Sequence, residues 1–165
     1  LKKGRRAEEL EQFALNDSMT GMYNRNAYDY FVKNEKDFEG YVIVTFDLNN
    51  LKQCNDQYGH RAGDEYIINA AHIIEDNFER YGKCYRIGGD EFCCIIPKGR
   101  YFKIERVMHK IDQDVEILNH KNIIPVPVGI AYGYAVFTAD DTDPEKVRER
   151  ADKDMYRNKK AMKQS

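Results

Sequence analysis

Four apolar runs along the chain predict β-strands. Residues 41–46 (Tyr-Val-Ile-Val-Thr-Phe) form a nearly continuous, β-branched run, which is typical of a central strand buried on both faces. The short runs 84–87 and 92–96 flank a Gly-Gly-Asp-Glu turn and predict a β-hairpin. Residues 128–137 alternate between two faces, and the prolines shortly before them delay the start of that strand.

Apolar residues at helical spacing predict helices between these strands. The expected helices cover residues 25–40, 65–80, 101–119 and a segment that begins at Pro144. Residues 48–63 are polar and rich in turn-forming side chains, so they predict a loop region. A thin apolar stripe over residues 1–16 indicates the end of a helix arriving from an upstream segment, with a frayed terminal helix as the alternative.

The order of these elements predicts an α+β fold in which several helices lie against one mixed or antiparallel sheet. The length of 165 residues corresponds to one domain, and 42% hydrophobic residues are enough for a core. The chain opens with Leu1, so we expect it to be part of a longer protein.

Composition excludes several classes of protein. The 26 basic and 28 acidic residues leave a net charge of −2, which argues against a nucleic-acid partner. No apolar run is long enough to span a membrane and no signal peptide is recognisable, so we expect no membrane contact by this domain. The four cysteines include no C-x-x-C pair, and Cys93 and Cys94 lie in an apolar run. Reduced, buried thiols indicate a cytoplasmic domain, although the parent protein could be membrane-anchored.

Three acidic residues form the strongest candidate site. Asp47 follows the 41–46 strand, and Asp90 and Glu91 lie in the hairpin turn. If the hairpin pairs beside that strand, these carboxylates meet at one edge of the sheet, where their mutual repulsion requires a cation. Hard oxygen ligands without nearby His or Cys favour Mg²⁺, which in turn favours a nucleoside triphosphate. The alternative is that these residues only form ordinary turns.

The polar stretch after Asp47 offers groups that could recognise a base. The amide of Asn55 and the carboxylate of Asp64 could together bind guanine, because adenine offers no matching pair of donors. In the alternative interpretation, Asn55 caps the end of one helix and Asp64 caps the start of the 65–80 helix.

Basic residues supply candidate phosphate ligands. Seven of them lie between Arg148 and Lys163, where a solvated helix face is the default interpretation. One or two of these side chains could turn inward and hold a terminal phosphate. Lys52 lies five residues after Asp47, on the acidic side of the sheet. Neither a Walker-type nor a Rossmann-type glycine loop is present in the sequence.

Four segments in order resemble the GGDEF family, the diguanylate cyclases. Residues 86–92 (Arg-Ile-Gly-Gly-Asp-Glu-Phe) are similar to the signature hairpin, and residues 17–25 to the entry segment, with methionines at 19 and 22 in place of leucines. Residues 46–64 resemble the segment of the family that binds metal and guanine. The closing helix of the family is similar to Asp154-Met155-Tyr156 with Lys159. The resemblance covers about residues 12–163.

The resemblance implies a nucleotide cyclase or polymerase-palm fold, with a five-stranded, mainly antiparallel sheet flanked by helices. It implies a linker helix over residues 1–16 and a catalytic domain over residues 17–165. Members of the family condense two GTP into cyclic di-GMP and release pyrophosphate. Two subunits of a homodimer each hold one GTP, and an upstream sensory or regulatory domain controls them.

The resemblance also assigns roles to individual residues. It implies that Asp47, the Leu48 carbonyl and Asp90 bind Mg²⁺, with Mn²⁺ as an alternative. It implies that Asp90 is the general base and that Lys52 stabilises charge on the phosphates. The implied substrate-binding residues are Asn55, His60, Asp64, Lys159 and Lys163, and further candidates are Glu91, Gly88 and Gly89.

The chain departs from the family pattern at three places. Asn49 stands where many members have a second Asp, and Lys163 replaces an Arg, which removes a bidentate grip on phosphate. Residues 79–82 read Glu-Arg-Tyr-Gly where the product-inhibition motif would be Arg-x-x-Asp. We therefore predict no feedback inhibition through this turn.

Three hypotheses follow. The first is an active diguanylate cyclase, because every acid, the guanine pair and Lys52 are in place. The second is a catalytically silent GTP-binding signalling module that regulates a partner. The third is a cyclase with a different nucleotide preference, against which Asp64 argues.

Overall fold

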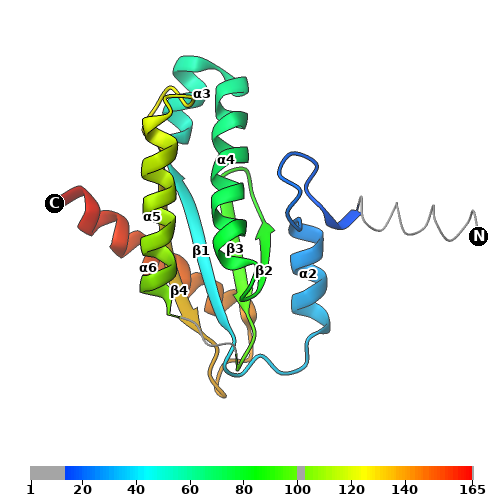
Figure 1. Cartoon of the computed structure of the whole chain (residues 1–165). Coiled ribbons are helices and arrows are strands. Elements are labelled where there is room, and N and C mark those ends of the chain that lie inside the picture. Colours follow the sequence, from blue (N-terminus) through cyan, green and yellow to red (C-terminus); the bar gives the residue numbers. More distant parts are fainter. Residues whose placement is uncertain (1–13, 100–102, 165) are drawn as a thin grey trace, which may run out of the picture.

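The chain folds into an antiparallel sheet with helices on both faces (Figure 1). The computed structural model describes residues 14–99 and 103–164, with side chains up to Lys159. The helix expected over residues 1–16 therefore lies almost entirely outside the described residues. Within the described ranges, the α+β class predicted from the sequence is confirmed.

Four strands make up the sheet that the structure describes. They are β1 (Val42–Asn49), β2 (Lys83–Arg86), β3 (Glu91–Ile96) and β4 (Gly129–Val136), in the order β2-β3-β1-β4 with every neighbouring pair antiparallel. The predicted hairpin is β2-β3, and β1 is central, as expected. The resemblance predicted a fifth strand, and this detail is wrong for the described residues. Pro125 and Pro127 precede β4, and proline has no N–H to donate to a strand ladder.

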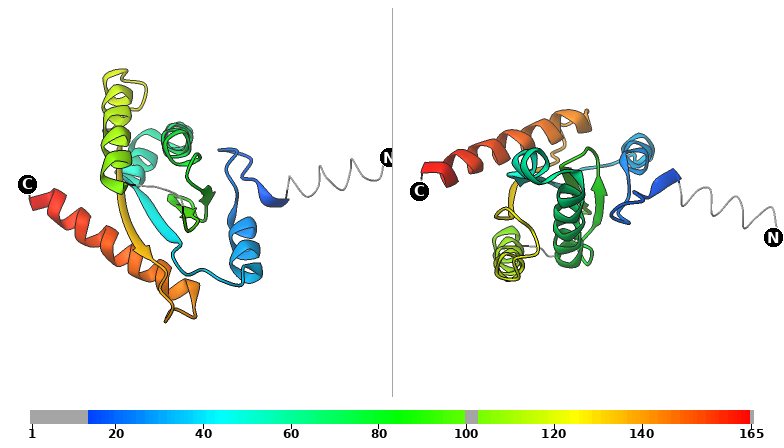
Figure 2. Two further views of the ribbon diagram at one scale, coloured as in Figure 1. Left: turned by 60° about the horizontal axis from the view of Figure 1, so that its bottom comes forward. Right: turned by 90° about the horizontal axis from the view of Figure 1, so that it is seen from above.

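In the described part of the chain, five helices pack around the sheet. They are α2 (Arg25–Asn34), α3 (Leu51–Tyr58), α4 (His60–Phe78), α5 (Ile104–His120) and α6 (Pro144–Gln164). Helix α2 ends earlier than predicted because Glu35 already has extended backbone angles. The views in Figure 2 show α6 crossing the sheet on the face opposite α5.

The segment 48–63 differs most from its prediction, because it is largely helical. Leu51 and Cys54 are both buried, so α3 has an apolar face that packs against α4 despite its polar composition. Only Gly59, with φ of +89°, separates the two helices. Glycine adopts this backbone conformation without the steric cost that a side chain would add, so it allows the sharp turn.

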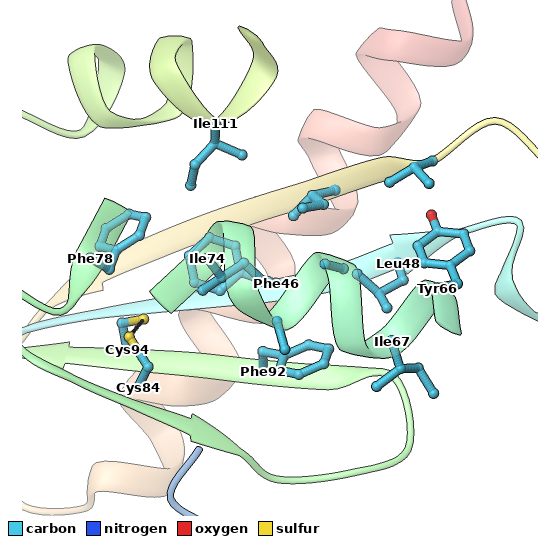
Figure 3. Packing of buried hydrophobic residues seen from close by; sticks show 14 of the residues in the cluster. Phe46, Leu48, Tyr66, Ile67, Ile74, Phe78, Cys84, Phe92, Cys94 and Ile111 are labelled. Carbon is cyan, nitrogen blue, oxygen red and sulfur yellow. Dashed lines mark hydrogen bonds between the residues drawn. The ribbon is translucent and has the colours of Figure 1, made fainter. Parts of the chain in front are cut away.

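Strand β1 is buried on both faces, as its apolar run predicted. Val44, Phe46 and Leu48 point into a core shared with α4 and α5 (Figure 3). Ile43 points the other way, into a second core shared with α2 and α6. All four cysteines are buried free thiols, in line with their interpretation as small core residues. None of the described helices has the length and hydropathy that crossing a bilayer requires.

The hydroxyl of Tyr66 joins α4 to the sheet. It donates to the carbonyl oxygen of Asn49 at 2.6 Å and accepts from the N–H of Gly129 at 2.9 Å. Burial raises the pKa of Tyr66 to about 12, so the hydroxyl keeps its proton at neutral pH. This contact fixes the beginning of α4 beside the end of β1, where the candidate site lies.

A stability test follows from the close approach of the turn after α4 to β3. A Cβ atom at Gly82 would lie 2.0 Å from the backbone oxygen of Ile95, so Gly82→Ala requires a shift of the backbone. We expect this variant to lose about 2 kcal/mol in urea unfolding, the usual cost of overpacking. Gly89→Ala is the matched control, because its Cβ would meet nothing within 4 Å. Equal stability of the two variants would contradict the close approach.

Candidate active site

The antiparallel pairing of β1 with β3 brings the predicted acidic residues together. Asp47 pairs with Glu91 across the two strands, and Asp90 immediately precedes Glu91. The N–H groups of Ile87 and Gly88 donate to the Glu91 carbonyl oxygen at 3.0 and 3.3 Å and close the hairpin. Two carboxylates that are 43 positions apart in the sequence thus share one edge of the sheet.

Asp90 has a raised pKa. The main cause is partial burial, and the negative charge of Asp47 and a hydrogen bond between the two carboxyl groups raise it further. Like charges at this separation favour retention of a proton on one of the pair. The site therefore holds a carboxylate of unusual basicity next to a second acidic side chain.

A lysine from the last helix balances this negative charge. Lys159 of α6 forms an ion pair with Asp47 Oδ2, and both side chains are about three-quarters buried. The other oxygen of Asp47 accepts the N–H of Leu48 at 3.0 Å. The partly buried carboxylate of Asp47 thus has a cationic partner that comes from a helix 112 residues away in the sequence.

The donor set at this edge fits a hard divalent cation. Asp47 and Asp90 offer neighbouring carboxylate oxygens, and the negative charge of Asp47 raises the pKa of Asp90. No group of three His, Cys, Asp or Glu side chains in the described part of the chain could hold a metal ion. An ion here would therefore need backbone, water or substrate oxygens as well, which is the usual coordination of Mg²⁺.

Arg86 is a residue whose structural role the sequence did not reveal. Its Nη1 donates to both carboxylate oxygens of Asp17, at 3.1 and 3.2 Å, and its Nη2 donates to the Gly89 carbonyl oxygen at 3.0 Å. Burial opposes ionisation of Asp17, but hydrogen bonds from Thr20 and Arg86 lower its pKa overall. Arg86 thereby ties the hairpin turn to the segment before α2.

Asn55 and Asp64 lie on packed helices, but neither is a cap. A Cβ at Gly63 would lie 1.7 Å from Asn55 Oδ1, so the Asn55 amide rests directly on α4 beside Asp64. The carbonyl of Asn55 continues α3 by accepting from Gly59, and Asp64 is the fifth residue of α4. Both capping interpretations are wrong, because α3 continues past Asn55 to Tyr58 and α4 already begins at His60.

The other predicted residues lie on α3, α4, α6 and the turns at the two ends of β2. Lys52 is in the first turn of α3 and His60 opens α4, and both are exposed. Lys163 lies in α6, with its side chain outside the described part. Gly88 and Gly89 form the hairpin turn, and residues 79–82 form the turn between α4 and β2 on the far side of the hairpin.

Comparisons with known proteins agree with this architecture. The family model described as "Diguanylate cyclase, GGDEF domain" matches residues 14–165. Diguanylate cyclase DgcS of Shewanella oneidensis is 29% identical over 158 residues, which cover 92% of this chain and 52% of DgcS. Cyclic di-GMP phosphodiesterase PdeR of Escherichia coli is 30% identical over 156 residues, which cover 92% of this chain and 24% of PdeR. The chain thus spans about half or less of the length of these relatives.

A solved structure has the same fold. The coiled coil and GGDEF domain of DgcB from Caulobacter crescentus, in complex with c-di-GMP, superposes with a TM-score of 0.80 at 23% identity. The alignment covers 97% of this chain and 88% of that one.

The raised pKa of Asp90 predicts how stability depends on pH. The pKa of Asp90 is higher in the folded state than in the unfolded state. Ionisation of Asp90 therefore destabilises the folded protein as the pH rises through that pKa. We expect Asp90→Asn to gain stability relative to the parent chain between about pH 4 and pH 7, measured by urea unfolding. Asp29→Asn, at an exposed ion pair with Arg25, is the control. If the difference in unfolding free energy between Asp90→Asn and the parent chain stayed constant across this range, the raised pKa of Asp90 would be contradicted.

The hydrogen bonds of Arg86 to Asp17 and Gly89 predict that this residue limits the mobility of the hairpin turn. We expect Arg86→Ala to speed amide hydrogen exchange at residues 88–91 by about tenfold, since the turn loses its contacts to Asp17 and Gly89. Arg25→Ala removes an arginine from an exposed ion pair and should leave these amides unchanged. Unaltered amide hydrogen exchange in Arg86→Ala would show that the turn is rigid without the hydrogen bonds of Arg86.

Proposed function

The chain belongs to the GGDEF family of diguanylate cyclase domains, and we propose that it condenses two GTP molecules into cyclic di-GMP. In each half-reaction a 3′-hydroxyl attacks the α-phosphate of the other GTP. One phosphodiester bond forms, one α–β phosphoanhydride bond breaks, and pyrophosphate leaves. The observation that carries the proposal is the meeting of Asp47 and Asp90 at one sheet edge, with Lys159 on Asp47.

Asp90 is the proposed general base. A carboxylate accepts a hydroxyl proton more readily when its pKa is raised, and burial together with Asp47 raises the pKa of Asp90. Its position at the hairpin tip leaves it half-buried, open to a substrate on one side. Glu91, the strand partner of Asp47, is exposed next to it.

Asp47, Asp90 and the Leu48 carbonyl are the proposed ligands for Mg²⁺, with Mn²⁺ as an alternative. The cation would neutralise the charge that develops on the attacking and leaving oxygens. The mutual repulsion of the two carboxyl groups supports this assignment.

Three lysines are the proposed phosphate ligands. Lys52, in the first turn after β1, would stabilise charge on the transferring phosphate. Lys159 and Lys163 lie four residues apart on α6, and both are proposed to hold the terminal phosphate. Lys159 lies at the acidic edge, where it forms an ion pair with Asp47.

Asn55 and Asp64 are the proposed guanine ligands, with His60 near them. The carboxylate of Asp64 can accept hydrogen bonds from the ring N–H and the exocyclic amine of guanine, and the Asn55 amide can donate to its carbonyl oxygen. The contact of Asn55 with Gly63, next to Asp64, supports a shared role.

Two copies of the chain are needed for this reaction. One site that holds one GTP cannot form both bonds of a symmetric product, so two sites must face each other across a two-fold axis. Because the curated relatives are longer than this chain, we propose that an upstream domain controls this encounter.

The alternative is a silent GTP-binding module that regulates a partner. One similar protein, PdeR, is named a cyclic di-GMP phosphodiesterase, so this stretch of sequence occurs in proteins named for another activity. Bound but unconverted GTP would favour this alternative.

Turnover is tested on a dimer forced by an N-terminal coiled-coil fusion, supplied with Mg²⁺ and either GTP or ATP. Chromatography should detect cyclic di-GMP from GTP alone. We expect Asp90→Asn to reduce this rate at least about 100-fold, which is typical for loss of a general base. Asp29→Asn, on an exposed face of α2, is the control. Unchanged turnover in Asp90→Asn would refute its role.

Base selection is tested with Asp64→Ala. We expect the preference for GTP over ATP to fall about tenfold or more, since charged hydrogen bonds contribute about 1.5–3 kcal/mol. The unfolding midpoint should change little, because Asp64 is inside α4 and caps no helix end. A variant that unfolds, or one that keeps full selectivity, would contradict this assignment.

A further inference from the structure

Strand β4 has an outer edge that the sheet leaves unpaired. It is the last strand in the described order β2-β3-β1-β4 and hydrogen-bonds to β1 on one side only. Backbone groups on such an edge need water or another partner, and proteins commonly cover them.

Helix α6 supplies partners to this edge through three side chains. Arg150 Nη2 donates to the Val136 carbonyl oxygen at 3.0 Å. The N–H of Tyr134 donates to Asp154 Oδ2 at 3.0 Å. Asn158 Nδ2 donates to the Tyr132 carbonyl oxygen at 2.8 Å. We call these three contacts the edge ladder.

The spacing of the edge ladder matches two different repeats. Its helix residues are four apart and advance about 6 Å along α6, whereas its strand residues are two apart and advance about 6.7 Å along β4. Since the two repeats nearly coincide, three successive contacts form with helix and strand running in opposite directions. A shift by one helical residue would turn the side chains about 100° away from the edge.

A second observation fixes α6 on β4 independently. A Cβ at Gly133 would lie 2.1 Å from the Met155 nitrogen and 2.3 Å from the Ala151 oxygen. The helix backbone therefore rests directly on the strand, with no side chain between them. Any residue other than glycine at 133 would push α6 away from the sheet.

The end of the edge ladder lies at the candidate active site. Asn158 precedes Lys159, and Ala131, next to Tyr132 on β4, pairs with Asp47 on β1. The position of α6 along β4 thus decides whether the ammonium group of Lys159 reaches the Asp47 carboxylate. A displacement by one helical turn would carry Lys159 about 5.4 Å along the helix axis.

We propose that Asp154 and Asn158 are positioning residues, which hold α6 in register on the edge of β4 and so keep Lys159 at the acidic site. For its catalytic consequence this inference rests on the proposed cyclase function. The placement of Lys159 itself can be measured without turnover, so the two proposals can fail separately.

The first measurement follows the Lys159 ammonium group by NMR in uniformly ¹³C,¹⁵N-labelled protein. Lys159→Arg assigns the signal, and Asp47→Asn gives its position without the ion pair. We expect Asp154→Ala and Asn158→Ala to move the signal to the Asp47→Asn position. Asp154→Asn should restore the native position, because its amide oxygen still accepts from the Tyr134 N–H.

Matched controls separate the edge ladder from other features of α6. Glu149→Ala and Lys153→Ala alter exposed positions on the same helix and should leave the Lys159 signal in place. Arg157→Ala removes the 3.5 Å ion pair of Asp154 but not its contact with Tyr134, and should also have no effect. Gly133→Ala should displace the signal through the backbone instead.

The second measurement is GTP turnover of the same variants in the forced dimer. We expect kcat/KM to fall about tenfold in Asp154→Ala and to recover in Asp154→Asn, whereas a merely electrostatic role of Asp154 would predict no recovery. A native Lys159 signal in folded Asp154→Ala and Asn158→Ala would overturn the inference. If the parent chain makes no cyclic di-GMP, the proposed function fails while the NMR comparison still decides the positioning role.

Discussion

The repulsion between two carboxyl groups is the constraint on which this site depends. The pairing of β1 with β3 fixes Asp47 beside Asp90, and both strands are held by cores on either face of the sheet. The backbone positions of the two residues cannot separate without breaking that register. The fold thus keeps two acidic side chains next to each other, where burial and the negative charge of Asp47 raise the pKa of Asp90.

Several elements converge to support this pair of acids. Helix α6 brings Lys159, the tie from Arg86 to Asp17 steadies the hairpin, and Tyr66 fixes the start of α4 beside the end of β1. These contacts come from distant parts of the chain. The acidic edge is therefore a product of the whole fold and not of one loop.

The sequence predicted the strands, the central position of β1 and the meeting of Asp47 with Asp90, because burial on two faces and a glycine turn leave clear local patterns. It missed α3, because the two buried residues of that helix, Leu51 and Cys54, are too few to reveal a period among polar neighbours. It gave Asp154 no role beyond the resemblance to the closing helix and did not single out Asn158, since their partners are backbone groups of β4. No side-chain pattern encodes a contact of that kind.

Gly63 shows how a residue without a side chain can decide where a neighbouring polar group lies. The Asn55 amide occupies the space that a side chain at position 63 would fill. Any larger residue there would displace this amide or separate α3 from α4, and the amide is the group proposed above to bind a guanine. The proposed base recognition therefore requires an empty position on a helix that would itself touch no ligand.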